Sequence, residues 1–337
     1  MITIDGSEGE GGGQVVRNAL ALSLVTGQPF RVEKARANRS KPGLMRQHVT
    51  AIEAACAIGN AECEGVAVGA SDFTFRPGKV VAGEHRFAVG TAGSTNLVLQ
   101  TILLPLLLAD GPSRIVLEGG THNVHAPPFD FLAKSFLPLV ERMGPRISAR
   151  LVRHGFYPSG GGRIEVEIVP ARLGRIELTD RGDPVSVRGR AVVASLPRDI
   201  AEREIDSARK DIDWPEDAFS IEQLPSDQGP GNIFLLEAEF AHHTEVTSGF
   251  GQLGVSAQSI GRKTASRMAG YIRSGTFAGP YLADQLLLPM ALAGGGAFTT
   301  VKPSQHALTA ANVIRRFLDR HIVFDARKGG AHHVEIR

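Results

Sequence analysis

A histidine near the carboxyl end of the chain, His306, is the side chain best placed to act as a nucleophile. Residues 299–302 are rich in β-branched side chains typical of a strand, and Pro303 and Ser304 suit a turn with a helix N-cap. Apolar residues then recur at helical spacing over residues 307–318. His306 is therefore expected in the first turn of a helix, where free N–H groups and the helix dipole favour a bound phosphate and a neutral imidazole. A neutral imidazole can attack phosphorus.

A lone histidine near a helix start is more often a hydrogen-bonding residue than a nucleophile, so other residues have to support this chemistry. The glycine-rich residues 8–13 lie between an expected strand and an expected helix, where glycine allows close backbone approach and the helix start can bind phosphate. The segment lacks the Gly-Lys-Ser/Thr of a P-loop and the spacing of a dinucleotide fingerprint, and a purely structural turn is an alternative. Glu10 within the glycines could bridge a divalent ion to phosphate oxygens, and Arg17 follows two turns along the helix.

A local cluster of positive charge follows, with six basic residues and one acidic residue, Glu33, between positions 31 and 46. The formal net charge of the whole chain is only +2, so a basic site has to be made by such clustering. A solvated surface is the usual explanation. However, Arg36, Arg39 and Lys41 fall in a turn from strand to helix, on the side of an α/β layer where ligands collect. Arginine suits a terminal phosphate there.

Two weaker candidates lie elsewhere. Tyr281 and Asp284 lie at the start of an expected helix. Tyr281 could pack against the core and Asp284 could complement the helix dipole, or both could face a nucleoside. His122 and His125 form His-x-x-His in a glycine- and proline-rich loop without a third metal ligand, so a metal site there is only a minor alternative.

The elements that would carry these residues repeat along the chain. A βαβαββ pattern of strands and helices is expected over residues 2–76 and again over residues 84–168. A partial third copy comprises a helix at 281–293, a strand at 297–301 and a helix at 306–321. Between the second and third copies the pattern changes, which predicts an inserted α/β domain at 183–276, with core segments at 1–182 and 277–337.

Composition is ordinary for a soluble globular protein, with 42% hydrophobic and 21% charged residues. The two cysteines, Cys56 and Cys63, match no disulfide or zinc framework. Residues 1–6 show no signal-peptide pattern, and the most apolar run, 97–109, is too short to span a bilayer. A cytoplasmic protein without a membrane partner is the expectation.

With these pieces in order, the chain resembles the RNA 3'-terminal phosphate cyclase family from its first strand to its last helix. The segments that carry the resemblance are residues 9–14 (GEGGGQ), 36–43 (RANRSKPG), 90–94 (GTAGS), 153–162 (RHGFYPSGGG), 227–232 (DQGPGN), 281–285 (YLADQ) and 303–306 (PSQH). The resemblance implies three βαβαββ repeats around a pseudo-threefold axis, with a smaller α/β domain inserted in the third.

The resemblance also implies a reaction. His306 would be adenylylated by ATP with release of pyrophosphate, AMP would pass to an RNA 3'-phosphate, and the neighbouring 2'-OH would displace AMP to leave a 2',3'-cyclic phosphate. Glu10 would hold a divalent cation, magnesium or manganese. Tyr281 and Pro127 would enclose the adenine. The other residues implied in ATP binding are Gln14, Arg17, Gln100, Phe131, Leu282, Ala283, Asp284 and Gln285; those implied for the RNA terminal phosphate are Arg36, Arg39, Gln47 and His48.

One segment departs from the family pattern, His-x-x-Thr-Asn, because Ala310 follows Thr309 and the nearest asparagine is Asn312. This puts in doubt what an asparagine would contribute to orienting the imidazole. Two other functions remain open: an inactive cyclase-like factor that binds RNA or assists ribosome assembly, and a small-molecule transferase such as an enolpyruvyl transferase. The first would be expected to lack the histidine, and the second needs neither the histidine nor an adenine site.

Overall fold

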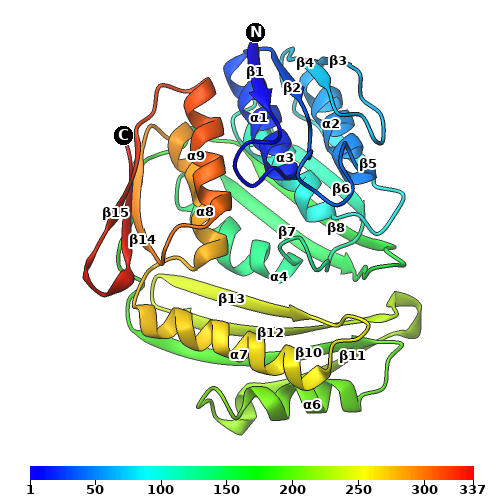
Figure 1. Cartoon of the computed structure of the whole chain (residues 1–337), viewed down its shortest axis with the longest axis vertical. Coiled ribbons are helices and arrows are strands. Elements are labelled where there is room, and N and C mark those ends of the chain that lie inside the picture. The colour runs from blue at the N-terminus through cyan, green and yellow to red at the C-terminus, as the bar shows by residue number, and fades with distance from the viewer.

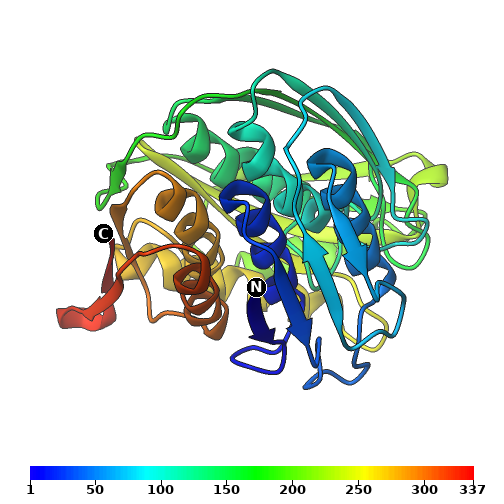
Figure 2. The ribbon, with the colours of Figure 1, turned by 90° about the horizontal axis from the view of Figure 1, so that it is seen from above.

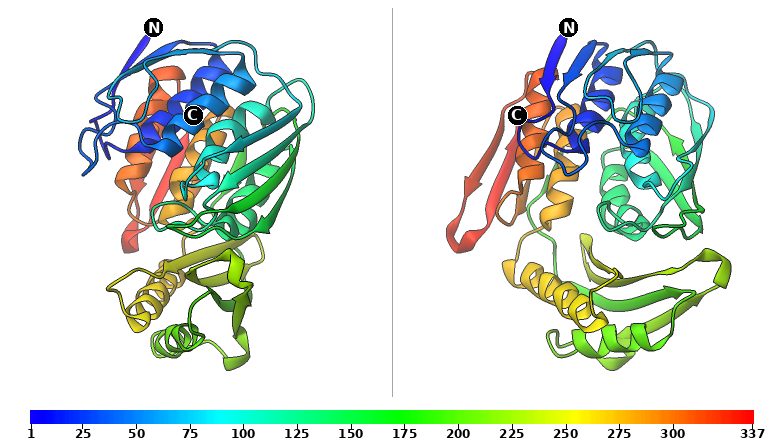
Figure 3. Two further views of the ribbon diagram at one scale, coloured as in Figure 1. Left: turned by 90° about the vertical axis from the view of Figure 1, so that its right-hand side faces the viewer. Right: turned by 45° about the vertical axis from the view of Figure 1, so that its right-hand side comes forward.

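The computed structural model describes all residues, 1–337, and contains four separate four-stranded sheets. Three of the sheets lie with their helices in one lobe, and the fourth forms most of a second lobe (Figure 1). Figure 3 shows the same two lobes from two other sides. The α/β fold class is confirmed.

The three sheets of the larger lobe share one topology. In chain order each contains two parallel strands followed by an antiparallel pair, and the spatial orders are β1-β2-β4-β3, β5-β6-β8-β7 and β9-β14-β16-β15. The first unit comprises β1 (Ile2–Asp5), α1 (Gly13–Thr26), β2 (Phe30–Glu33), α2 (Arg46–Gly59), β3 (Glu62–Glu64) and β4 (Phe73–Arg76). The second comprises β5 (Glu84–Ala88), α3 (Thr95–Leu107), β6 (Ser113–Gly119), α4 (Phe129–Phe131), η1 (Leu132–Phe136), α5 (Leu137–Glu141), β7 (Arg146–Arg153) and β8 (Gly162–Val169).

The third unit is interrupted after its first strand. It comprises β9 (Ile176–Leu178), then α8 (Pro280–Leu292), β14 (Gly296–Thr300), α9 (Gln305–Phe317), β15 (Ile322–Ala326), the short turn η4 (Lys328–Gly330) and β16 (His332–Ile336). β9 pairs in parallel with β14, so the third sheet closes across the inserted residues. The pseudo-threefold axis itself stays a prediction.

Two details differ from the expected elements. The helix expected at 306–321 ends at Phe317, because Leu318 takes an extended conformation, and the antiparallel strands β15 and β16 follow. The second helical segment of the second repeat contains the π-helical turn η1, in which the amide of Leu137 bonds to the carbonyl of Leu132. Pro138 follows this turn and has no amide hydrogen for a regular helical bond, which accounts for the irregularity.

The second lobe is built from β10 (Pro184–Ala194), α6 (Asp199–Ala208), η2 (Glu216–Ala218), β11 (Phe219–Leu224), η3 (Ser226–Gln228), β12 (Gly231–Phe240), β13 (His243–Phe250) and α7 (Ala257–Ser274). Its sheet has the order β11-β10-β12-β13. α6 and α7 cover one face around a separate cluster of buried side chains, whereas residues of the other face, such as Ile233 and Val246, join the main core. The exact limits of an inserted domain, 183 and 276, stay a prediction.

Helices of all three repeats meet inside the larger lobe, with the sheets outside them (Figure 2). α1 packs against α9 and α3, and α8 packs against α9. Burial of apolar side chains from all these helices in one core cluster fixes their relative positions. The glycine-rich segment before α1 therefore lies beside the start of α9. None of the helices combines the length and the apolar character needed to cross a membrane.

Candidate active site

His306 lies in the first turn of α9, as the sequence predicts. The hydroxyl of Ser304 caps this helix by accepting the amide of Ala307 at 3.1 Å. The imidazole is about half exposed, and its Nδ1 lies 3.0 Å from Oε1 of Gln14. Because an amide oxygen only accepts, Nδ1 carries the hydrogen in this pair, and Nε2 of the neutral ring keeps its lone pair.

The surroundings of His306 favour that neutral ring. Partial burial lowers the pKa of His306 below its ordinary value, and the positive charges of Arg17 and Arg39 lower it further. The unprotonated form is therefore the main form at neutral pH. Such a ring has a nucleophilic nitrogen available without a separate base.

Glu10 also lies beside Nδ1 of the imidazole. One carboxylate oxygen forms an ion pair with Arg39, and the other, Oε2, is buried without a hydrogen bond and lies 3.8 Å from Nδ1 of His306. The backbone amide of Glu10 donates to the hydroxyl of Thr309 at 3.0 Å, which ties the glycine-rich segment to α9. Gly12 has no space for a side chain, because a Cβ there would overlap both carboxylate oxygens of Glu10.

The buried oxygen of Glu10 fits one ligand of a hard divalent cation. An unpaired buried carboxylate oxygen is unfavourable unless a cation or a hydrogen-bond donor meets it. No cluster of three or more His, Cys, Asp or Glu side chains suited to a metal occurs in the structure. Phosphate and water oxygens would therefore have to complete the coordination, as is usual for magnesium. His122 and His125, which were only a minor alternative for a metal site, form no such cluster, and His122 bonds to Asp130.

A polar pocket adjoins Gln14 between helices α1, α3 and α8. Its lining includes Arg17 and Asn18 of α1, Gln100 of α3 and Asp284 of α8. Burial lowers the pKa of Arg17 to about 10, although the charge of Asp284 opposes the shift. Burial raises the pKa of Asp284 to about 7, against the opposing effects of Gln285 and Arg17. Buried ionisable groups with perturbed pKa values that line a pocket are typical of a functional site.

The expected nucleotide residues of α8 and α3 are joined by hydrogen bonds. The side-chain amide of Gln100 donates to Oε1 of Gln285 at 2.5 Å, and Gln285 donates to Asp284 at 2.8 Å. Tyr281, at the start of the same helix, is 53% exposed and free to meet a ring. Leu282 and Ala283 are buried in the core, so neither presents an exposed side chain to a ligand.

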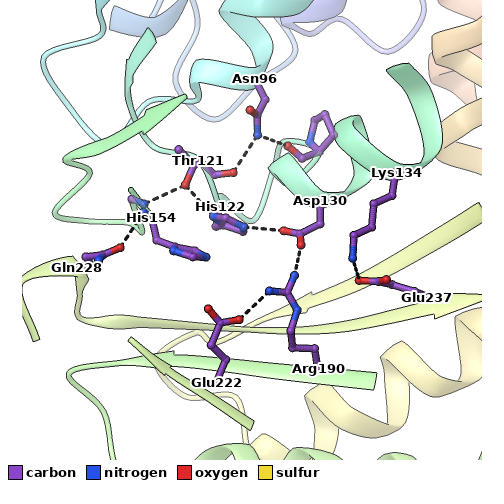
Figure 4. Close-up of polar contacts among 12 residues, drawn as sticks. Asn96, Thr121, His122, Asp130, Lys134, His154, Arg190, Glu222, Gln228 and Glu237 are labelled. Atoms are coloured by element: carbon purple, nitrogen blue, oxygen red, sulfur yellow. Dashed lines mark hydrogen bonds and ion pairs between the residues drawn. The ribbon is translucent and has the colours of Figure 1, made fainter. Parts of the chain in front are cut away.

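Two further expected residues of the second repeat, Pro127 and Phe131, lie just before α4 and at its end. Phe131 is buried, whereas Pro127 is partly exposed. The side chain of Asn96 holds the carbonyl of Pro127 at 2.8 Å and that of Thr121 at 2.9 Å (Figure 4). The loop that carries Pro127 is thereby fixed to α3.

The four residues expected at the RNA phosphate differ in their surroundings. Arg36 donates to the carbonyls of Lys41 and Gly43, each at 2.7 Å, so it shapes its own loop. Arg39 pairs with Glu10. Lys41 and the neighbouring residues 38–42 are largely exposed.

Gln47 and His48 lie at the start of α2. Gln47 accepts the amide of Ser94 at 3.3 Å, which links it to the glycine turn of the second repeat. His48 is buried, and its Nδ1 accepts the amide of Met45 at 3.0 Å. Burial and the charges of Arg17 and Arg36 lower the pKa of His48 to about 3, so its ring is neutral.

Three residues of the site were not predicted in these roles. Gln14 was expected to bind nucleotide, yet it contacts the imidazole directly. Thr309 and Asn18 were not assigned to the site at all. Thr309 lies three residues after His306, on the same side of α9, so helical spacing could have indicated it. Asn312, the asparagine displaced from the family pattern, accepts from Arg315 instead.

Comparison with known proteins gives one consistent family. The family model described as RNA 3'-terminal phosphate cyclase matches residues 8–324. A curated protein from Koribacter versatilis named RNA 3'-terminal phosphate cyclase is 50% identical over 94% of this chain and 90% of its own length. A protein of the same name from Ralstonia nicotianae is 46% identical over 97% of this chain and 94% of its own length. The one from Ectopseudomonas mendocina shares 44% over 100% of this chain and 98% of that protein.

The chain therefore belongs to a family of enzymes. That family is the RNA 3'-terminal phosphate cyclase family. Among solved structures, the enolpyruvyl transferase NikO from Streptomyces tendae matches 99% of this chain but only 48% of that chain, with 11% identity and a TM-score of 0.36. A likeness of that size carries no argument about function.

Proposed function

We propose that this enzyme uses ATP to convert an RNA 3'-terminal phosphate into a 2',3'-cyclic phosphodiester through a covalent histidine–AMP intermediate. Family membership supports the overall reaction. The observation that carries the mechanism is the neutral His306, held through Nδ1 by Gln14 with Nε2 available, beside the unpaired oxygen of Glu10.

In the first step Nε2 of His306 attacks the α-phosphorus of ATP. A P–N bond forms, the bond to the bridging oxygen breaks, and pyrophosphate leaves with the electron pair. Arg17, on the first helix after the glycines, lies where it can neutralise phosphate charge. A divalent cation held by Glu10 would neutralise further charge on the phosphates.

In the second step an oxygen of the RNA 3'-phosphate attacks the same phosphorus, and the P–N bond breaks to restore the imidazole. The RNA then ends in a pyrophosphate linkage to AMP. In the third step the 2'-hydroxyl of the terminal ribose loses its proton to solvent and its oxygen attacks the 3'-phosphorus. The pyrophosphate bond to the adenylyl group breaks, and AMP leaves with the electron pair. This step gains from proximity, because nucleophile and phosphorus belong to one nucleotide. Arg36, Arg39, Gln47 and His48 are the proposed contacts of the RNA end.

The test is covalent labelling with ATP that carries its label at the α-phosphate, in the presence of magnesium. We expect protein-bound label that is labile in acid and stable in base, as for a phosphoramidate. His306→Ala should abolish the label, and His321→Ala, which alters another exposed histidine, should retain it. A folded wild-type protein that takes up no label with magnesium or manganese would refute the catalytic proposal in favour of an inactive RNA-binding factor.

A further inference from the structure

The lobe formed by β10–β13, α6 and α7 contacts two segments that bound the polar pocket beside Arg17. On one side, the π-helical turn η1 contributes Phe136 to the pocket, and on the other side α8 contributes Asp284. Pro127 lies just before α4, which leads directly into η1, and Tyr281 lies at the start of α8; these two residues are the proposed enclosure for adenine. The inference below rests on the proposed function, because it takes this pocket as part of the ATP site.

Two consecutive residues of β13 reach both segments. The carbonyl of Thr244 accepts the hydroxyl of Ser135 at 2.6 Å, and Ser135 immediately precedes Phe136. The carboxylate of Glu245 accepts the amide of Gly279 at 3.1 Å, and Gly279 is the N-cap residue of α8. Because adjacent residues of one strand lie at a fixed separation, β13 sets the distance between η1 and the start of α8.

The contact through Glu245 is built as a rigid one. Its side chain is only 1% exposed, and the same oxygen that holds Gly279 receives a hydrogen bond from Nε2 of His243 at 3.1 Å. The His243 ring stacks on Phe277 with 5.0 Å between centroids. A carboxylate also suits the positive end of α8, which has no side-chain cap of its own. Tyr281 lies two residues beyond this anchor.

A second set of contacts holds the other segment by charge (Figure 4). Arg190 of β10 forms ion pairs with Asp130 and with Glu222, the latter at 2.7 Å. Asp130 is buried and also bonds to His122 at 3.0 Å. Asp130 immediately precedes Phe131 and lies three residues after Pro127.

One turn further along, Lys134 of η1 pairs with Glu237 of β12 at 2.5 Å. Three strands of the second lobe thus hold α4 and η1. A buried charge that loses its partner is costly, so these pairs resist displacement of the segment.

We propose that the β10–β13 sheet is a positioning element for the ATP site, with Arg190 and Glu245 as its positioning residues. Arg190 holds the segment that carries Pro127 and Phe131, and Glu245 holds the start of α8 that carries Tyr281. No hydrogen bond or ion pair joins the sheet to His306, to the glycine-rich residues 8–13 or to the basic loop at residues 36–43. It acts on how well the adenine enclosure is formed before ATP arrives, and hence on ATP affinity.

The test compares Arg190→Gln with Arg188→Gln. Both alter an arginine of β10, but Arg188 is exposed and makes no ion pair or side-chain hydrogen bond. For Arg190→Gln we expect the KM for ATP in covalent labelling, and the Kd for AMP by calorimetry, to rise about tenfold. The maximal labelling rate should stay within about threefold of wild type, with KM for the RNA end unchanged. Arg188→Gln should match wild type throughout.

Glu245 gives a second, independent pair of variants. Glu245→Gln keeps an oxygen that can accept the amide of Gly279, whereas Glu245→Ala does not. We expect near-normal AMP affinity for the first and a loss of about tenfold for the second. Thermal unfolding of each variant distinguishes a specific loss of nucleotide affinity from a general loss of fold. A general loss of fold would lower the maximal rate and RNA binding along with ATP affinity.

The outcomes separate this proposal from the proposed function. The positioning role alone would be overturned if the wild type is labelled and Arg190→Gln binds ATP and AMP as tightly as Arg188→Gln does. AMP binding without labelling in the wild type would overturn the catalytic proposal alone, and the Arg190 comparison would still decide the positioning role through the Kd for AMP. A wild-type protein that binds no adenine nucleotide would overturn both.

Discussion

Replacing Gln14 by Met should slow the adenylylation of His306 without weakening ATP binding. The substitution keeps the length of the side chain but removes the oxygen that accepts the Nδ1 hydrogen at 3.0 Å. Gln14 is only 6% exposed, so its amide is well fixed, whereas the half-exposed His306 can turn toward water once released. Loss of the hydrogen bond between Gln14 and His306, partly offset by water, should raise the activation free energy by about 1 to 2 kcal/mol. The labelling rate should therefore fall by about 5- to 30-fold.

The assay is a single-turnover measurement of label transferred to protein at saturating ATP, with KM for ATP measured separately. Gln258→Met, at an exposed glutamine without a side-chain hydrogen bond, is the matched control and should behave as wild type. Gln14→Glu restores an acceptor but adds a negative charge that raises the pKa of His306, so its rate should recover as the pH is raised. A Gln14→Met variant with a normal rate and a raised KM would refute the reasoning, because it would show that Gln14 contacts the nucleotide and not the histidine.

Three further outcomes follow from the site and its surroundings. Glu10→Gln removes the charge of the buried oxygen, so the magnesium concentration for half-maximal labelling should rise about tenfold or more; an unchanged value would place the cation elsewhere. The wild-type labelling rate should be lost only as the pH falls below about 6.5, because the pKa of His306 lies below that of a free imidazole, and a loss beginning above pH 7 would contradict this. Burial raises the pKa of Glu204 to about 8, although its bond with Asn232 and the charge of Arg203 oppose this. The stability that protonated Glu204 contributes to the fold is fully present below the unfolded pKa of about 4.5 and is lost as the pH rises through 8. Glu204→Gln should therefore raise the unfolding temperature by about 2 °C or more at pH 8 and by less at pH 5.

The sequence predicted most of what local patterns determine. Residue type and spacing predict the strand, glycine turn and helix within residues 2–26, and the structure contains them. They also predict the capped helix that begins beside His306, which the structure contains as well. The strands β15 and β16 were not predicted. They are short, and they are stabilised by pairing of β16 with β14 and of β15 with β16, partners that a local pattern does not reveal.

The roles of individual side chains were harder to predict, because they depend on contacts between distant segments. Gln14 and His306 are separated by 292 positions, so the sequence could place both near phosphate but could not pair them. The bonds from the Arg36 guanidinium to the carbonyls of Lys41 and Gly43 were not predicted either, and the role of Arg36 at the RNA phosphate stays a prediction. Asp130 and Arg190 meet only because the second lobe packs on α4. Composition and periodicity carry no information about such contacts between distant residues.

The bond from the amide of Glu10 to Thr309 also has a consequence for the order in which the site is assembled during synthesis. The two residues are 299 positions apart, and the first two repeats and the second lobe are synthesised before α9. A nascent chain can therefore fold these parts before the segment that carries His306 leaves the ribosome. The contact between the glycine-rich segment and α9 forms only afterwards, so the surroundings of His306 are among the last parts of the fold to be completed.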